Sequence, residues 1–329
     1  MGAQTGPMTT NTISEHPFPP FEQRALAGRV ALVAGATRGA GRAIAVSLAR
    51  AGAHVWCTGR STAGRPSDYG RPETLDGTLA LIAEHGGRAE AHVCDHLDPD
   101  QVRALVERID AVHGRLDILV DDIGGEAYMS RGESFWQRDL EAGMRQLRTG
   151  LITHVITAHA ALPLLTRRPG GLVVDITDGT EEYNGTHFRD SVWLDLTKTA
   201  VSRFAFGLGH ELRAAGATAV AITPGWLRSE LMLEAFSTTE ETWWADSLDA
   251  DRDLPPADFA ISESPHLLGR AVTALAADPD RGRFTTRTVS TFALARHYGF
   301  SDTDGSRPDS WGYIAAKEKH GRADPEAFR

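Results

Sequence analysis

The sequence predicts an α/β fold in which helices cover both faces of a doubly wound, mainly parallel sheet of seven strands. Two observations lead to this prediction. Short, continuously apolar runs, such as residues 30–34, are typical of strands that are buried on both faces. Segments with apolar residues at helical spacing separate these runs, and this alternation favours a parallel sheet with crossover helices.

The first half of the chain supplies four predicted strands, at residues 30–34, 53–58, 88–94 and 116–120. The helix after the first strand has Ile44 and Leu48 on its apolar face. The next helix ends at the pair Gly86 and Gly87, a typical stop signal. Asp98 is the expected N-cap of the third helix, because a proline follows it at the first helical position.

The second half supplies three further predicted strands, at residues 172–176, 217–223 and 283–290. A long helical region over 135–165 is expected to bend near Gly143 and Gly150. Further helices are expected over 192–213 and from Ser264 to Leu275. We expect one domain over 26–295, a loose polar extension over 1–25 and a C-terminal tail over 296–329.

The composition restricts the partners and the compartment. A net charge of -10 argues against nucleic acid or an anionic membrane surface as the main partner. No apolar run reaches about 18 residues and no secretory signal is visible at the N-terminus, so we expect a cytoplasmic protein. Cys57 and Cys94 fall in predicted buried strands, which is typical of small core residues in a reducing compartment.

The turn after the first strand carries the strongest functional signal. The strand runs directly into Gly35-Ala-Thr-Arg-Gly39-Ala-Gly41 and then into a predicted helix. Such glycines let the backbone turn sharply and let a pyrophosphate approach, while the N–H groups and dipole of the new helix favour the anion. An ordinary tight turn is the competing interpretation, but the strand-before and helix-after context predicts a dinucleotide site.

The G-x3-G-x-G spacing, with Leu26-Ala-Gly-Arg-Val30 before it, resembles that of the short-chain dehydrogenase/reductase family. The resemblance covers about residues 26–290 and implies a Rossmann-type fold with hydride transfer from a nicotinamide coenzyme. No acid ends the second strand, where NAD-specific sites usually have one. Arg38 in the turn and Arg60 after that strand suit a 2′-phosphate instead, so we expect NADP(H). Two solvated surface arginines are the competing interpretation.

The resemblance implies further coenzyme contacts. Asp95 and His96 match a family position that contacts adenine, and Lys198 matches the lysine that holds the nicotinamide ribose. Asp121-Asp122-Ile123-Gly124 replaces the family's Asn-Asn-Ala-Gly and keeps its glycine. Ser229 takes the place of the threonine in Pro-Gly-x3-Thr that bonds the nicotinamide amide. The full predicted set is Gly35, Thr37, Arg38, Gly39, Gly41, Arg60, Asp95, His96, Gly124, Lys198, Pro224, Gly225 and Ser229.

The catalytic residues that the family implies are mostly replaced. Leu194 stands four residues before Lys198, where the family has the tyrosine of Tyr-x3-Lys, and Tyr183 lies too far upstream to be that tyrosine. Gly150 replaces the family's helix asparagine, and Asp178 replaces its serine. Leucine cannot protonate a developing alkoxide, a role that contributes about 10²–10⁴ in rate.

Three ways of replacing the missing proton donor remain open. Asp178 could act as the acid if burial raises its pKa. Tyr183 or His187 could donate a proton from the loop 181–190. An iminium substrate would need no acid, because hydride addition yields a neutral amine. The competing interpretations are an Asx-turn role for Asp178, ordinary loop roles for Tyr183 and His187, and a surface position for Lys198.

We therefore expect an NADPH-dependent oxidoreductase acting on a carbonyl, conjugated or imine-type group. Segment 226–261 resembles the family's substrate lid, and residues such as Trp243 and Trp244 indicate a bulky, apolar or aromatic small-molecule substrate. The alternative is a non-redox protein on the same scaffold, either a cyclase, dehydratase or isomerase using Asp178 or an NADP-sensing module. Family members pair through helices equivalent to 135–165 and 192–213, so the resemblance implies a homodimer or homotetramer.

We expect no metal site. His92, Cys94, Asp95 and His96 follow one strand, whose residues alternate between faces, so their side chains should not converge. The stretch Asp302-Thr-Asp304-Gly305 is similar to part of a calcium loop, but its neighbours do not supply the EF-hand ligands.

Overall fold

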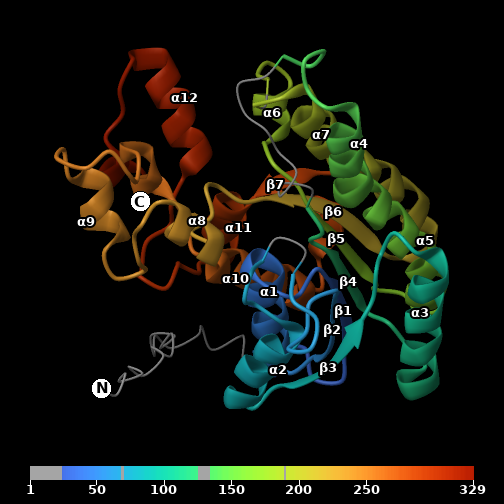
Figure 1. The fold of residues 1–329 in the computed structure, drawn as a ribbon. Coiled ribbons are helices and arrows are strands. Elements are labelled where there is room, and N and C mark those ends of the chain that lie inside the picture. The colour runs from blue at the N-terminus through green and yellow to red at the C-terminus, as the bar shows by residue number, and fades with distance from the viewer. Residues whose placement is uncertain (1–23, 68–69, 125–133, 189) are drawn as a thin grey trace, which may run out of the picture.

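Seven parallel strands form a single sheet in the order β3-β2-β1-β4-β5-β6-β7, which confirms the predicted fold class (Figure 1). The computed structural model describes residues 24–67, 70–124, 134–188 and 190–329, so residues 1–23 of the predicted extension lie outside the described residues. The strands are β1 Val30–Ala34, β2 His54–Gly59, β3 Arg88–Val93, β4 Ile118–Asp121, β5 Leu172–Ile176, β6 Thr218–Thr223 and β7 Thr288–Ser290.

Helices cover both faces of this sheet. On one face lie α1 Gly39–Arg50, α2 Leu75–Glu84, α10 Pro265–Ala277 and α11 Thr291–Tyr298. On the other lie α3 Pro99–His113, α4 Leu140–Leu147, α5 Thr153–Leu165 and α7 Val192–Glu211. In β1, Val33 packs into the first layer and Leu32 into the second, because successive strand residues point to opposite faces. This two-sided burial explains why the strand is apolar throughout.

The helical region predicted over 135–165 is divided differently from the prediction. Its helix begins at Leu140, and the interruption is a π-helix, η3 Arg148–Ile152, which contains Gly150. The bend predicted near Gly143 is wrong, because Gly143 lies inside the regular helix α4. A Cβ at Gly143 would come within 2.1 Å of Cε2 of Trp193, so this glycine lets α4 and α7 pack closely.

Two other predicted boundaries also change. The seventh strand is shorter than predicted, because η6 Arg281–Phe284 and a left-handed Thr286 (φ 68°) precede β7. Cys94 lies just beyond β3 and not within it. Both cysteines are nevertheless buried free thiols, and burial raises the pKa of Cys57 and of Cys94 to about 12.

The N-cap predicted at Asp98 is confirmed, since its side chain accepts from the N–H of Asp100.

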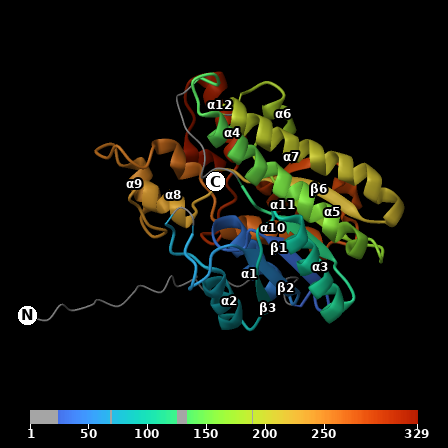
Figure 2. The same ribbon diagram turned by 45° about the vertical axis from the view of Figure 1, so that its right-hand side comes forward.

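The C-terminal tail is folded and packs against the segment predicted to be a lid. The tail contains α12 Ser310–His320 and η7 Pro325–Phe328, and η7 contacts η5 Ala257–Ile261. In both ribbon views the helices α8 Glu230–Ala235 and α9 Trp243–Leu248 lie together on one side of the molecule (Figures 1 and 2). The remaining short helices are α6 Glu181–Asn184 and η4 Leu212–Ala215. Among the described helices, none combines the length and apolar character needed to cross a bilayer.

Candidate active site

The carboxyl ends of six strands, β1 to β6, border one cleft with a volume of about 1390 Å³. Gly35, Asp122, Thr177 and Pro224, which follow β1, β4, β5 and β6, all line it. In open α/β sheets ligands bind at this edge. The cleft brings together nearly all of the predicted site residues, namely Gly35, Thr37, Arg38, Gly39, Arg60, Asp95, His96, Gly124, Asp178, Tyr183, Lys198, Pro224, Gly225 and Ser229.

Gly41 is the predicted coenzyme residue that does not line the cleft. A Cβ at Gly41 would lie 2.4 Å from the carbonyl oxygen of Gly35, so this glycine permits the tight first turn of α1. Gly35 itself has a φ of +92°, and a Cβ there would lie 2.8 Å from the carbonyl oxygen of Asp122. These two close approaches hold the N-terminal end of α1 against the edge of the sheet.

A carboxylate that the sequence analysis missed sits at this helix end. Oε2 of Glu230 accepts from the backbone N–H of Gly39 at 3.0 Å, and Oε1 lies 3.1 Å from Nη1 of Arg42. An anion is favoured there, because the first N–H groups of a helix have no intrahelical partners and carry the positive end of its dipole. Glu230 also begins α8, so it joins the lid to the glycine turn.

Three arginines line one end of the cleft. Two of them, Arg38 and Arg60, were predicted to meet a 2′-phosphate. Nη2 of Arg38 donates to Oγ of Ser67 at 3.2 Å, and Nη1 of Arg60 lies 3.8 Å from Oδ2 of Asp95. The third, Arg71, lies in the insert after β2 and pairs with Glu73 at 2.5 Å. Its signal in the sequence was only a basic, turn-rich insert next to Arg60.

His96 lines the cleft but is held on both sides. Its ring nitrogens lie 2.8 Å from Oγ1 of Thr58 and 2.7 Å from Oγ1 of Thr157. Burial lowers the pKa of His96 to about 4, so the imidazole is neutral at physiological pH. His96 therefore links β2 to α5, and of the predicted pair Asp95 is the more accessible to a ligand.

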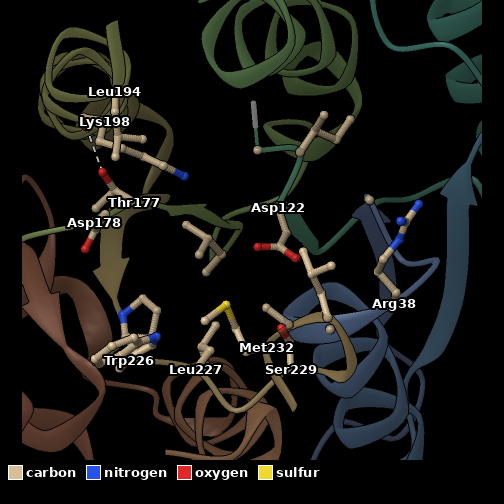
Figure 3. A pocket seen from close by; sticks show the side chains of 18 of the residues that line it. Arg38, Asp122, Thr177, Asp178, Leu194, Lys198, Trp226, Leu227, Ser229 and Met232 are labelled. Carbon is tan, nitrogen blue, oxygen red and sulfur yellow. Dashed lines mark hydrogen bonds between the residues drawn. The ribbon is translucent and has the colours of Figure 1, made fainter. Parts of the chain in front are cut away.

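Lys198 and Leu194 lie at the other end of the cleft, one helical turn apart on α7 (Figure 3). Their exposed fractions are 7% and 5%. The hydroxyl of Thr177 donates to the carbonyl oxygen of Lys198 at 2.7 Å, which fixes α7 to the end of β5. Lys198 is thus a buried site residue and not a surface lysine, and the aliphatic side chain of Leu194 fills the position where the family has a phenol.

The predicted proton donors take different positions. Asp178 and Tyr183 line the cleft, whereas His187 does not. The ring of His187 stacks on Tyr183 at 4.1 Å, and its Nε2 lies 3.0 Å from Oε2 of Glu318 in α12. The backbone carbonyl of Asp178 accepts from the side chain of Asn184, so Asp178 belongs to an ordered turn before α6. Of the two loop candidates, Tyr183 is therefore the one that lines the cleft.

The tail supplies a wall that the sequence analysis did not anticipate. Trp311, Tyr313 and Ile314 of α12 line the cleft. A Cβ at Gly225 would lie 2.1 Å from Oγ of Ser310, so the start of α12 rests directly on the Pro-Gly turn after β6. No motif in the tail pointed to this contact.

A fully buried guanidinium connects the lid to the tail. Nη2 of Arg228 lies 2.9 Å from Oε1 of Glu240 and 3.6 Å from Oδ2 of Asp302, and its guanidinium stacks 3.8 Å from the ring of Trp243. Asp302 also accepts from the backbone N–H of Ser264 at 2.7 Å. The segment similar to a calcium loop therefore acts, through Asp302, as an anchor for the tail.

Below the cleft, a second charged group was also missed. Nδ1 of His154 lies 2.7 Å from Oδ1 of Asp175, and its Nε2 lies 3.2 Å from the carbonyl oxygen of Ile123. His154 of α5 thus joins the end of β5 to the loop after β4. Burial, together with the charge of Asp175, raises the pKa of the neighbouring Asp121 well above its ordinary value. These polar side chains lie buried beneath the loop that lines the cleft.

A second buried carboxyl group, that of Glu263, holds the Pro-Gly turn and gives a testable pH dependence. Its Oε2 accepts from the N–H of Gly225 at 2.9 Å, and burial raises the pKa of Glu263 from 4.5 to about 8. The folded state therefore holds the carboxyl proton of Glu263 more tightly than the unfolded state does. The stabilisation that this proton provides is full below about pH 4.5 and is lost as the pH rises to about 8. Glu263→Gln cannot ionise and should gain roughly 2–4 kcal/mol relative to the native chain between these pH values.

Urea unfolding at several pH values measures this difference, with Glu241→Gln, an exposed position, as the matched control. Parallel pH profiles for the native chain and Glu263→Gln would contradict the assignment.

Comparison with known proteins finds a matching family model, similar sequences and a similar fold. The model of the short chain dehydrogenase family matches residues 29–240. The mouse dehydrogenase/reductase SDR family member 1 is 33% identical over 282 residues, which cover 84% of this chain and 84% of the mouse protein. Its human counterpart is 31% identical over 287 residues, with the same coverage. A short chain dehydrogenase from Burkholderia cenocepacia, solved in complex with NADP, superposes with a TM-score of 0.62 at 24% identity, covering 81% of this chain and 97% of that one.

Proposed function

The chain belongs to the short-chain dehydrogenase family, and we propose that it is an NADPH-dependent oxidoreductase acting on a carbonyl, conjugated or imine-type group of a bulky small molecule. One observation carries the proposal. A single cleft joins the glycine turn and its arginines at one end to Lys198 and a wall of aliphatic and aromatic side chains at the other. Consumption of NADPH in the presence of candidate ketones, enones and imines tests it directly.

The cleft residues fit a phosphorylated dinucleotide. The glycine turn leaves space that a Cβ would fill at Gly35, and the N-terminal end of α1 suits a pyrophosphate. Arg38 and Arg60 would hold the 2′-phosphate, because guanidinium groups match phosphate geometry. Lys198 would hold the nicotinamide ribose, and Ser229 the amide. The bound coenzyme would supply a hydride to the substrate carbon.

The substrate end of the cleft is lined by large side chains from three segments. Trp226, Leu227 and Met232 of the lid face Leu194 and Lys198 across the cleft (Figure 3). The loop after β5 adds further apolar surface, and so does α12. Such surroundings favour a bulky, apolar or aromatic molecule with a few polar groups.

Asp178 is the proposed proton donor. It lines the same cleft as Lys198 and directly follows Thr177, whose hydroxyl donates to the carbonyl oxygen of Lys198 (Figure 3). It would donate its proton to the substrate oxygen as the hydride reaches the carbon, and would recover one from solvent afterwards. Tyr183, also on the cleft wall, is the proposed substitute if the substrate lies closer to α6. An imine-type substrate, already charged, would require neither residue.

A non-redox reaction is the second candidate, and the buried Leu194 favours it, because no hydroxyl stands beside Lys198 at that position. A cyclase, dehydratase or isomerase using Asp178 would convert its substrate while the coenzyme keeps its redox state. Product analysis combined with NADPH absorbance separates the two candidates. Product formed without loss of NADPH absorbance would replace the first proposal with the second.

The arginines give a test of coenzyme choice. Arg38→Ala and Arg60→Ala should each weaken NADPH binding about tenfold and leave NADH binding nearly unchanged, because only NADPH carries the 2′-phosphate. Isothermal titration calorimetry measures both affinities. Arg65→Ala is the matched control, since Arg65 is exposed in the same insert and does not line the cleft. Equal losses for NADPH and NADH would show that the arginines do not select the phosphate.

The missing phenol gives a test of the donor. Leu194→Tyr should raise the rate of ketone reduction by about 10-fold or more, because it restores an acid next to Lys198. Leu194→Phe supplies the same bulk without the hydroxyl and should not. Asp178→Asn should lower the rate by at least about tenfold in the native background, and less in the Leu194→Tyr background. Equal rates for native and Asp178→Asn chains would exclude Asp178 as the donor.

The chain is also proposed to pair through α4, α5 and α7. These helices expose apolar side chains, including Leu140 at 63%, Val155 at 37% and Leu196 at 48%. Covering them in a homodimer, or in a tetramer built from such dimers, would remove this area from water. The double variant Val155→Glu/Leu196→Glu should be monomeric in light scattering, whereas Val93→Glu on β3, also exposed, should keep the native mass. Unchanged mass for the double variant would place the interface elsewhere.

A further inference from the structure

We propose that Glu230 competes with the coenzyme for the N-terminal end of α1, so that coenzyme binding releases the lid helix α8 from the glycine turn. The inference rests on the proposed function, because it concerns the same pyrophosphate site. It is carried by the 3.0 Å hydrogen bond from the N–H of Gly39 to Oε2 of Glu230, which joins residues 191 positions apart in the chain.

The competition follows from the chemistry of the contact. One backbone N–H cannot serve both the carboxylate and a phosphate oxygen at full strength, and two anions at the same helix end repel each other. Arg42 helps to hold the carboxylate at the turn, because its Nη1 lies 3.1 Å from Oε1 of Glu230. A pyrophosphate at the turn must displace the carboxylate before it can use these donors.

The displacement would move the lid because of where Glu230 lies. It is the first residue of α8, and Ser229 before it and Met232 after it both line the cleft. The side chain of Ser229 already rests on the turn, since its Cβ lies 3.7 Å from the position a Cβ would take at Gly39. Moving Glu230 away from Gly39 therefore shifts the residues proposed to meet the nicotinamide and the substrate.

The pair Glu230→Gln and Glu241→Gln tests the competition. Glu230→Gln keeps the shape of the side chain and removes its charge, and should bind NADPH and inorganic pyrophosphate about tenfold more tightly than the native chain. Glu241 is exposed in the same segment 226–261 and does not line the cleft, so Glu241→Gln should change neither affinity. Calorimetry on the full chain gives the affinities, and thermal unfolding checks that each variant is folded.

Hydrogen exchange of residues 230–235 measures whether α8 is released from the glycine turn. Saturating NADPH should speed exchange in α8 of the native chain, and Glu230→Gln should show part of this increase without coenzyme.

The outcomes separate the two proposals. Tighter pyrophosphate binding by Glu230→Gln, with no NADPH binding by any chain, would support competition with a pyrophosphate group at α1 and overturn the proposed function. If each ligand, NADPH and pyrophosphate, bound with the same affinity to the native chain and to both variants, the competition would be overturned and the proposed function would stand. No binding of either probe to any chain would overturn both.

Discussion

The buried guanidinium of Arg228 is the interaction on which the walls of the cleft depend. Taking a charged group out of water is costly unless anions and acceptors replace the solvent. Glu240 supplies one anion from the lid and Asp302 supplies another from the tail, while Trp243 covers the flat face of the guanidinium. One charge can be satisfied in this way only when lid and tail are both in place. The same interaction therefore holds both walls of the cleft around the ends of the strands.

Features that depend on neighbouring residues could be predicted from the sequence. The apolar run of β1, the cap at Asp98 and the glycine turn each express a local rule of backbone geometry or hydrogen bonding. The family resemblance, and not local geometry, assigned Gly35 and Lys198 to one coenzyme site, and both residues line the cleft. The same resemblance supplied the other expected contacts, and most of those residues also line it.

Features that depend on distant residues could not be predicted. Glu230 and Gly39 are 191 positions apart in the sequence, and no pattern around either residue predicts their contact. His154, Asp175 and Asp121 come together only because α5 packs over the ends of β4 and β5. The π-helix at Gly150 and the shortened β7 likewise reflect local conformations that apolar periodicity does not encode. The contribution of the C-terminal tail to the cleft could not be predicted either, because Ser310 meets Gly225 only in the folded chain.

The contact between Ser310 and Gly225 has a consequence for how such proteins diversify. The glycine turn and its arginines come from residues before 72, whereas α12 comes from the last twenty or so positions of the chain. Changes in that final segment can reshape one wall of the cleft without touching the glycine turn. Chimeras that exchange this segment between relatives, joined just before α12, would therefore alter the cleft while keeping the glycine turn.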